Sequence, residues 1–326
     1  MDFKDFRAGR DDDSKRIDHI LARILDGFGN ARIQEAIRKR LVRLNNAKTT
    51  PGQRVCEGDT ISVAAFLLSG RGPEIQSSEK KSAKSFSGMP QLDVVFKNEH
   101  ILIINKPRGI SAQPSMNGGP SLSEWVSTLY PGEKDSLSFR TGPLHRLDKN
   151  TSGLIAFSQS STGARWFSSA MGEHKIKKTY VGIAEGRIEK AETWVDMLSE
   201  SKTGVGFHKM EAATEKDRGQ EAITHVTPLA HGKNRNGELT LVQFDIETGR
   251  KHQIRCQSME HGHPLMGDSA YNGHGKTFYL HATRLSFPDD NPIGLPAQIF
   301  CNIPDDFKKI LDLNLLNWDG QLIIFR

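Results

Sequence analysis

One stretch without helical or strand periodicity divides this chain of 326 residues into two unequal parts. Residues 69–90, SGRGPEIQSSEKKSAKSFSGMP, are rich in Gly, Ser and Lys, a composition typical of a flexible linker. The chain is too long for one average domain, and 36% hydrophobic residues suffice for a core on each side. The sequence therefore predicts a small domain over residues 14–68 and a large domain over residues 91–326.

The small domain is predicted to begin with two short amphipathic helices. Apolar residues recur at helical spacing over residues 17–25, with Ser14 as the N-cap, and over residues 33–41, with Asn30 as the N-cap. A hairpin with short strands should follow, because turn dipeptides separate the next apolar residues.

The second of these helices and the loop after it are strongly basic. Seven Lys or Arg residues lie between residues 31 and 54, against the single acid Glu35. A solvated charged helix explains such a run, and a phosphate-binding surface explains its clustering equally well. The candidate nucleic-acid contacts are Arg32, Arg38, Lys39, Arg40 and Arg43.

The large domain mixes strands and helices without regular alternation. Apolar runs predict strands at residues 92–96, 101–105, 154–157, 180–184, 239–246 and 279–287, and helices at residues 164–171 and 251–261. This order predicts an α+β fold with a mixed, mainly antiparallel sheet flanked by helices. We expect the polar stretch 202–220 to form a surface loop.

Composition excludes several classes of protein. The three cysteines, Cys56, Cys256 and Cys301, form no paired motif, and His261 and His263 have no companion ligands, so we expect neither disulfides nor a metal site. No apolar run is long enough to span a membrane, and residues 1–6 carry early acids and no apolar stretch, so we expect neither export nor a membrane span. The net charge of +5 is small for a nucleic-acid-binding protein taken as a whole, so the distribution of the charge matters more than its sum. We expect a cytoplasmic monomer.

The most informative short stretch is HRLDKNTSG, residues 145–153. It places Asp148 before a tight polar turn that runs into an apolar strand, so the carboxylate should lie at the rim of a sheet. An aspartate that only caps its own turn would be the ordinary interpretation. Two further segments argue against that reading, KKTYVGIAEG around Tyr180 and TGRKHQIR, which places Arg255 early in a helix with His252 on the same face.

Together with GHPLMGD and YLHATRLSF, these motifs resemble the RluA-type pseudouridine synthases across nearly the whole chain. The N-terminal part, with VRLNN and PGQRVCEGDTISV, resembles the S4 RNA-binding domain. The resemblance implies a catalytic domain with a mixed, mainly antiparallel sheet, no cofactor, and RNA as the substrate. Within the family, the likeness is nearest to the RluC-like enzymes of large-subunit ribosomal RNA.

The resemblance also implies roles for individual residues. Asp148 matches the essential aspartate, Tyr180 the tyrosine that stacks on the target base, and Arg255 the basic partner of the aspartate. Arg146 matches the arginine that enters the RNA where the uridine leaves, and His145 belongs to the same RNA-facing motif.

The chemistry of uridine isomerisation fits these roles. A carboxylate can attack C1′ or remove a ribose proton, and the sequence leaves both open. An adjacent guanidinium keeps such a carboxylate ionised, an aromatic ring holds the detached uracil, and an inserted side chain offsets the cost of flipping a base.

Other functions remain open at this point. The RNA can be 23S ribosomal RNA, the expected substrate, or transfer RNA. A non-catalytic RNA-binding assembly factor would need a damaged site, yet Asp148, Tyr180 and Arg255 are all present. A hydrolytic N-glycosidase would need a second acid near Asp148 at glycosidase spacing, and none is evident.

Overall fold

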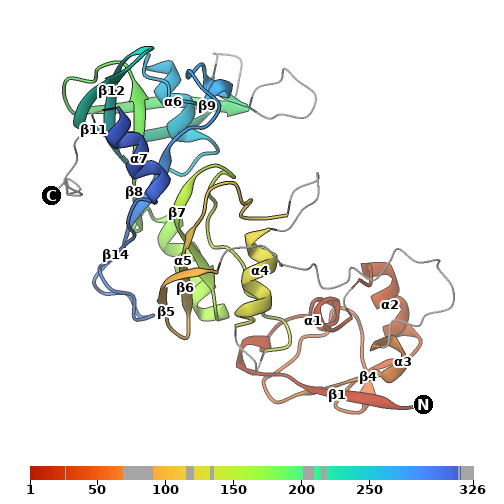
Figure 1. The fold of residues 1–326 in the computed structure, drawn as a ribbon. Coiled ribbons are helices and arrows are strands. Elements are labelled where there is room, and N and C mark those ends of the chain that lie inside the picture. Colours follow the sequence, from red (N-terminus) through yellow and green to blue (C-terminus); the bar gives the residue numbers. More distant parts are fainter. Residues whose placement is uncertain are drawn as a thin grey trace.

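The computed structural model describes residues 1–25, 27–68, 91–114, 121–132, 136–200, 209–213, 219–314 and 316. The strands of these residues form two separate sheets, one of four strands and one of ten. Figure 1 shows the small sheet near the N-terminus and the large one in the rest of the chain. We call them the N-terminal unit, residues 1–68, and the C-terminal unit, residues 91–316. The linker predicted over residues 69–90 lies outside the described residues.

The N-terminal unit contains both predicted helices and the predicted hairpin. Its sheet has the order β1-β4-β2-β3 and is antiparallel throughout. A core of its own, including Ile17, Leu21, Ile33 and Ile61, holds the helices on the sheet. The elements are β1 (Phe3–Arg7), the 3-10 turn η1 (Arg10–Asp12), α1 (Ile17–Ile24), α2 (Asn30–Arg38), β2 (Val42–Leu44), β3 (Ala47–Lys48), β4 (Thr60–Ala64) and α3 (Ala65–Leu68).

The predicted helix starts differ from the observed ones. Ser14 is not the N-cap of α1, because its φ of 61° is left-handed and the extended N-cap position is held by Arg16. In α2 the N-cap is Gly29, and Asn30 is already the first helical residue. Neither β1 nor η1 was predicted, since their residues are mostly charged.

The C-terminal unit is built on the ten-stranded sheet, in the order β10-β9-β11-β12-β8-β13-β7-β6-β5, with β14 paired to β13. All pairs are antiparallel except β13 with β7. The elements are β5 (Asp93–Lys97), β6 (Ile101–Lys106), α4 (Leu122–Leu129), β7 (Ser152–Ser158), α5 (Ser161–Gly172), β8 (Lys177–Glu185), β9 (Glu192–Glu200), β10 (Met210–Ala212), β11 (Gln220–Asn234), β12 (Gly237–Ile246), α6 (Gln253–Glu260), the 3-10 turn η2 (Ser269–Tyr271), β13 (Leu280–Ser286), β14 (Gln298–Phe300) and α7 (Asp305–Leu313).

The large sheet is covered on both faces, which explains its continuous apolar strands. Along β8, Tyr180 and Ala184 join one core with residues of α4 and α6, whereas Val181 and Ile183 join another core with residues of α7. Residues of α5 pack on that second face against β6 and β7. Successive residues of a strand face opposite sides, so both sides must be apolar. The face with α4 and α6 is the one that carries Tyr180.

The six predicted strands and both helices of this unit are present, and the mixed, mainly antiparallel sheet is confirmed. Two details were wrong. His252 is not helical, because its φ of 51° is left-handed and α6 begins at Gln253. Within the stretch 202–220, residues 210–212 form β10 and pair with β9 instead of lying in a loop, while residues 201–208 and 214–218 lie outside the described residues.

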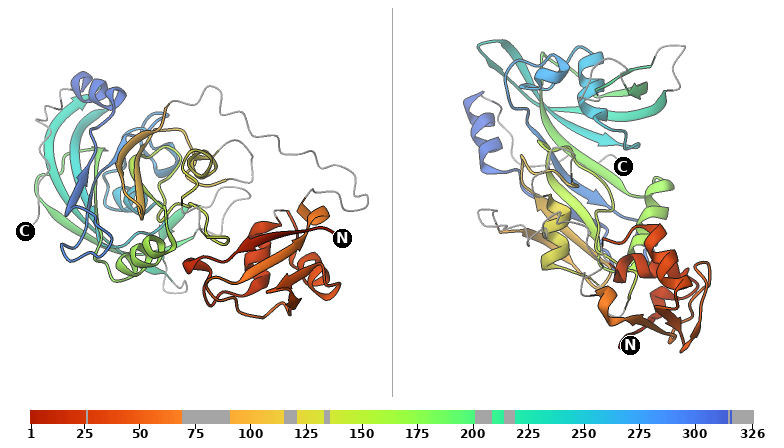
Figure 2. Two further views of the ribbon diagram at one scale, coloured as in Figure 1. Left: turned by 90° about the horizontal axis from the view of Figure 1, so that it is seen from below. Right: turned by 90° about the vertical axis from the view of Figure 1, so that its right-hand side faces the viewer.

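Figure 2 shows the N-terminal unit lying to one side of the large sheet. In the parts of the chain that are described, no helix combines the length and apolar character that a bilayer crossing requires.

Candidate active site

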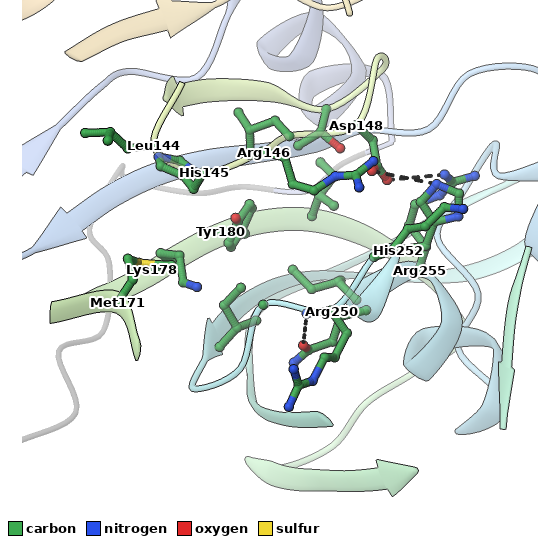
Figure 3. A pocket seen from close by; sticks show the side chains of 18 residues that line it. Leu144, His145, Arg146, Asp148, Met171, Lys178, Tyr180, Arg250, His252 and Arg255 are labelled. Carbon is green, nitrogen blue, oxygen red and sulfur yellow. Dashed lines mark hydrogen bonds and ion pairs between the residues drawn. The ribbon is translucent and has the colours of Figure 1, made fainter. Parts of the chain in front are cut away.

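The three residues predicted to carry the chemistry lie around one cavity of about 240 Å³. Asp148 comes from the turn before β7, Tyr180 from β8, and Arg255 from the first turn of α6. Figure 3 shows that the side chains of all three converge on this space, although they are far apart in the sequence. The cavity is somewhat below the roughly 300 Å³ at which pockets for drug-sized ligands begin, so it suits a ligand of single-nucleotide size.

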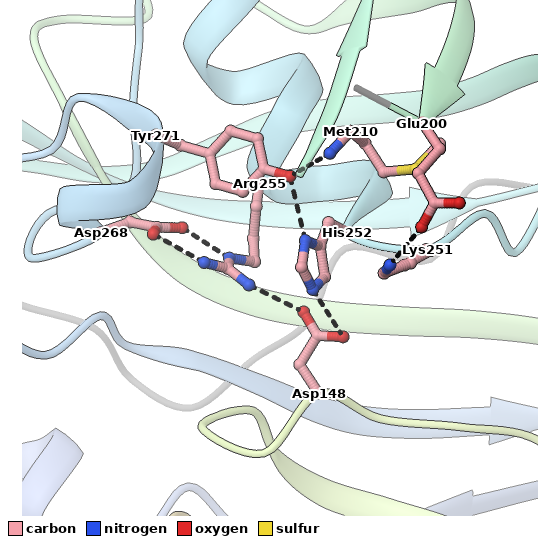
Figure 4. Close-up of polar contacts among 8 residues, drawn as sticks. All are labelled: Asp148, Glu200, Met210, Lys251, His252, Arg255, Asp268 and Tyr271. Atoms are coloured by element: carbon pink, nitrogen blue, oxygen red, sulfur yellow. Dashed lines mark hydrogen bonds and ion pairs between the residues drawn. The ribbon is translucent and has the colours of Figure 1, made fainter. Parts of the chain in front are cut away.

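Asp148 is held from two directions. Arg255 Nη1 donates a hydrogen bond to Asp148 Oδ2 at 3.3 Å, and His252 Nε2 lies 3.7 Å from Asp148 Oδ1. The carboxylate side chain is 17% exposed, so it is partly shielded and still reachable. Figure 4 shows both contacts reaching the carboxylate from the α6 side, and Asp148 itself lines the cavity.

Arg255 is shared between two carboxylates, and Asp148 has the weaker share. Its Nε and Nη2 donate to Asp268 Oδ2 and Oδ1 at 2.6 and 2.8 Å, the parallel two-bond geometry that fixes a guanidinium most firmly. Burial lowers the pKa of Arg255, but the hydrogen bonds and charge of Asp268, with Asp148, outweigh it and the net shift is upward. Arg255 is therefore a permanently charged group of fixed orientation.

The rings of Tyr271 and Phe278 hold the guanidinium in place as well. Their centroids lie 4.9 and 4.6 Å from Arg255 Cζ. Cation–π contacts of this kind stabilise a buried arginine and restrict its motion. The two carboxylates, Asp148 and Asp268, share the single charge of this guanidinium.

His252 is a neutral ring beside Asp148. Burial lowers its pKa to about 4, with Arg255 and Lys251 adding to the effect. Its Nδ1 lies 3.0 Å from the Tyr271 hydroxyl, which accepts a hydrogen bond from Met210 N at 2.9 Å. The hydroxyl proton then points to Nδ1, and the ring proton sits on Nε2, facing Asp148.

The backbone around Asp148 explains the polar turn and the glycine of the HRLDKNTSG motif. Gly153 pairs with Ala282 where β7 and β13 run parallel, and a Cβ at Gly153 would lie 2.3 Å from the Ala282 carbonyl oxygen. The chain must also adopt a φ of 109° there, which side chains disfavour. Only glycine allows the end of this turn to lie so close to β13.

A buried lysine, Lys106, binds the backbone of the same turn. Lys106 Nζ donates to the carbonyl oxygens of Pro107, Ile110 and Lys149 at 2.9–3.0 Å, tying two loops together next to Asp148. Burial lowers the pKa of Lys106 to about 7, and the charge of Asp148 opposes that shift.

His145 and Arg146 differ, although they are neighbours in the sequence. Arg146 is exposed and lines the cavity. His145 Nε2 accepts a hydrogen bond from Ala156 N at 3.0 Å, and its ring stacks on Phe167. Burial, with the charge of Lys178, lowers the pKa of His145 to about 3, so the ring is neutral. His145 also lines the cavity, so its neutral ring anchors the loop beside the site, and its contact with RNA stays a prediction.

Tyr180 and Lys178 form the cavity wall from one face of β8. Tyr180 is 6% exposed, and burial and then the charge of Asp148 raise its pKa above the ordinary value, so the phenol stays protonated. Burial, with Arg250 and Lys177, lowers the pKa of Lys178 to about 8. Arg250 lines the same wall. The wall thus offers one aromatic ring beside two cationic side chains.

A second hollow of about 500 Å³ adjoins the first. Arg146, Asp148, His252 and Arg255 line both, so Asp148 stands where the two meet. The second hollow is lined further by polar and basic side chains that include Gln113, Lys149 and Lys276.

The five basic residues predicted to bind nucleic acid all lie exposed on the N-terminal unit. Arg32 and Arg43 stack over the rings of Phe28 and Phe3, at 4.5 and 4.2 Å, and Lys39 pairs with Glu35 at 2.7 Å. Arg38 lies at the end of α2 and Arg40 just after it. None of them lines the cavity around Asp148.

Sequence reasoning missed four residues of the site. Asp268, Tyr271, Lys178 and Lys106 had no assigned role, and His252 was placed on a helix without one. Asp268 ends the GHPLMGD motif, which is the signal that could have found it, since a buried arginine needs a buried acid.

Comparisons with known proteins agree with this geometry. Residues 100–260 match the family described as RNA pseudouridylate synthase, a span that includes Asp148, Tyr180 and Arg255. An uncharacterized RNA pseudouridine synthase, YhcT, of Bacillus subtilis is 30% identical over 257 residues, covering 78% of each chain. A ribosomal large subunit pseudouridine synthase D of Neisseria meningitidis is 28% identical over 320 residues, covering 91% of this chain and 78% of that protein.

A solved structure has the same fold. The human protein RNA pseudouridylate synthase domain containing 4 superposes with a TM-score of 0.55 at 19% identity, covering 69% of this chain and 94% of that one. With a partly shielded aspartate, its arginine and a buried tyrosine around one cavity, the chain belongs to the RNA pseudouridylate synthase family, in the RluA-type branch, and isomerises uridine to pseudouridine in RNA.

Proposed function

We propose that this enzyme modifies uridines of large-subunit ribosomal RNA, with Asp148 as its catalytic carboxylate. The observation that carries the assignment of Asp148 is its ion pair with Arg255, at 3.3 Å, inside a cavity that Tyr180 also lines. The choice of RNA follows the relatives, of which several are named ribosomal large subunit pseudouridine synthase D.

The reaction needs no redox partner. The bond between N1 of uracil and C1′ of ribose breaks, the uracil turns, and its C5 joins C1′; C5 then loses its proton and N1 takes one up, so the product is an isomer. Asp148 serves either as the nucleophile at C1′ or as the base that removes a ribose proton. Both routes need an ionised carboxylate that the sugar can reach, and Asp148 is 17% exposed and lines the cavity.

The shared arginine suits this chemistry better than an exclusive pair would. A carboxylate that is fully neutralised by a bidentate arginine is a poor base and a poor nucleophile. Here Arg255 gives its two shortest bonds to Asp268 and a longer one to Asp148, so Asp148 keeps most of its reactivity while its position is fixed. Neutral His252 steadies the other oxygen without removing charge.

The two hollows suggest how the RNA lies. The uracil stacks on Tyr180 in the first hollow, a contact worth roughly 1–3 kcal/mol for nucleobases on aromatic rings. The strand leading away from the flipped nucleotide follows the second hollow past Lys149 and Lys276. Arg146, exposed where the hollows join, fills the gap that the flipped base leaves, which offsets part of the unstacking cost.

The N-terminal unit acts as an S4-like docking module in this proposal. Helices α1 and α2, the hairpin and the exposed arginines give it a charged surface that can follow a phosphate backbone. A cytoplasmic monomer is the matching expectation for location and assembly.

Within the family, the relatives named ribosomal large subunit pseudouridine synthase D support a target like that of synthase D more than the RluC-like target expected from the sequence. Transfer RNA remains the alternative substrate. A non-catalytic assembly factor fits poorly, because the acid, its arginine and the tyrosine lie together. A hydrolytic N-glycosidase fits poorly too, because Asp268, the acid that shares Arg255 with Asp148, is buried against that arginine.

Mapping pseudouridines tests the substrate. Ribosomal and transfer RNA from cells with and without the gene are treated with carbodiimide and read by reverse transcription. We expect at least one stop in large-subunit RNA to vanish without the gene and to return with the wild-type gene but not with Asp148→Asn. A loss confined to transfer RNA would overturn the ribosomal assignment.

A further inference from the structure

The run of three acids at residues 11–13 has no role in the site, and two of its members are unexpectedly buried. A short run of charged residues near a chain end is normally solvated. Asp12 is 0% exposed and Asp11 is 7% exposed, whereas Asp13 is exposed. A buried carboxylate is costly unless hydrogen bonds replace its water, so its donors show what it holds.

The donors to Asp12 come mostly from the other unit. Gly9 N supplies one bond, at 3.0 Å, within the N-terminal unit. Leu137 N donates to Oδ2 at 2.9 Å, and Ser138 N and Ser138 Oγ donate to Oδ1 at 3.0 and 2.5 Å. Ser136 Oγ adds a bond to Oδ1 at 3.1 Å. One carboxylate thus binds three consecutive residues that lie far away in the sequence, in the other unit.

Further contacts surround this bond set. Asp11 Oδ2 accepts from Ser161 N, the first residue of α5, at 3.0 Å, and Lys15 Nζ donates to Ser138 Oγ at 2.8 Å. Arg140 Nη2 donates to the Arg23 carbonyl at 3.2 Å. Leu137 packs against the hydrophobic core of the N-terminal unit, so the contact has an apolar part as well.

Residues 136–138, which bind Asp12, lead directly to the turn that carries Asp148. After Phe139 the chain runs along β7, with Leu144 N bonded to the Ala156 carbonyl and Ala156 N bonded to His145. Arg146 and Asp148 follow at once. The contact with the N-terminal unit and the catalytic acid therefore lie on one continuous, hydrogen-bonded stretch of chain.

We propose that Asp12 is a positioning residue that locks the N-terminal unit onto the C-terminal unit at residues 136–138, so that RNA held by the first is presented to Asp148 at a fixed offset. The lock itself stands on the geometry above, and its effect on catalysis rests on the proposed docking function. A module that is only tethered would search many positions, whereas a locked one presents its RNA in a single register.

Distances between spin labels test the lock without RNA. One label goes on exposed Cys56 and the other on Lys190→Cys in the C-terminal unit, with Cys301→Ser to remove a part-buried thiol. We expect a narrow distance distribution that Asp12→Asn broadens. Leu137→Ser removes the apolar part of the same contact from the C-terminal unit, and it should broaden the distribution too. With two independent variants, misfolding of one does not decide the result. Circular dichroism checks that both are folded.

Asp13→Asn is the matched control, since it removes the same charge from the adjacent residue, whose hydrogen bonds, to Ser14 and Glu57, lie within the N-terminal unit. It should leave the distribution narrow. A broad distribution in the unsubstituted protein, or a narrow one in folded Asp12→Asn and Leu137→Ser, overturns the lock.

Tritium release from large-subunit RNA transcripts tests the consequence. We expect Asp12→Asn to lower kcat/KM by about tenfold or more, mainly through KM, because the tethered but unlocked unit loses effective concentration. The value for Asp13→Asn should stay near wild type. Equal kcat/KM in the two variants would refute the positioning role. An inactive wild type would instead count against the ribosomal substrate, and the label distances would still decide the lock.

Discussion

Arginines in the two units stand in opposite surroundings. On the N-terminal unit, Arg32, Arg38 and Arg40 are exposed. In the C-terminal unit, Arg255 is 7% exposed, pinned by Asp268 and enclosed by two aromatic rings. An exposed arginine can follow any phosphate backbone, whereas a pinned one serves a single geometry. We therefore expect the first group to set RNA affinity and Arg255 to set the rate.

Among the substitutions that compare the two groups of arginines, Arg255→Ala should lower the rate most and separate its effect on rate from its effect on RNA affinity. Its removal leaves Asp148 and Asp268 facing each other without a counter-charge, and we expect kcat to fall by about 10³-fold, as for loss of one preorganised charged donor. RNA affinity should change little. Single-turnover kinetics together with filter binding measure both quantities.

The conservative variant Arg255→Lys controls for folding, because it keeps the charge but cannot make two bonds to Asp268 while reaching Asp148. It should fold normally and remain slow. If folded Arg255→Ala reacts within about tenfold of wild type, Arg255 is not needed to position the acid.

Asp268→Asn should have the next largest effect. This substitution loosens the guanidinium without removing it, and misplacement of a catalytic group by about 1 Å costs roughly 10²-fold. The control is Asp306→Asn, since Asp306 is an exposed acid that pairs with Arg108 at 3.3 Å away from the site. A normal rate in Asp268→Asn would show that Arg255 keeps its place without Asp268.

Reversing charge on the N-terminal unit should change binding instead of chemistry. For the triple variant Arg38→Glu, Arg40→Glu and Arg43→Glu we expect RNA affinity to fall and kcat at saturation to hold. The slope of log affinity against log salt should drop by about 0.7–0.9 for each phosphate that the variant no longer neutralises. Lys190→Glu, which changes an exposed charge on the other unit, is the control. An unchanged slope in the triple variant would remove this surface from RNA docking.

The smallest expected effect concerns pH. Lys178 lines the first hollow and is cationic below its pKa of about 8 and neutral above it, so its attraction for a nucleotide bound there weakens as pH rises through that value. We expect kcat/KM to decline a few-fold above about pH 8. Lys178→Arg stays charged and should flatten the decline. Identical pH profiles for the two proteins would exclude a role for the charge of Lys178.

Local patterns predicted most of the fold. The strands at residues 154–157 and 180–184 were found because both faces of the large sheet are apolar, which makes continuous runs. The strands β9 and β11 were missed because their outward residues are polar and break such runs. Helix α4 carried a usable signal, a capping box between Ser121 and Glu124.

The site was predictable where a motif carried the chemistry and unpredictable where long-range geometry did. Asp148, Tyr180 and Arg255 came from motifs, and the structure brings all three to one cavity. That Arg255 belongs more to Asp268 than to Asp148 depends on two hydrogen-bond lengths, which no spacing encodes. The hydrogen bonds between Asp12 and residues 136–138 could not be predicted from the sequence either, because an acidic run near a chain end is normally solvated.

The most direct measurement is tritium release by Asp148→Asn on 5-tritiated uridine RNA, run beside an RNA-binding assay on the same protein. Asparagine keeps the shape of the side chain and loses its charge. We predict turnover lower by about 10⁴-fold or more, with RNA affinity nearly unchanged. Near-normal turnover by this variant would contradict the claim that the carboxylate beside Arg255 carries the reaction.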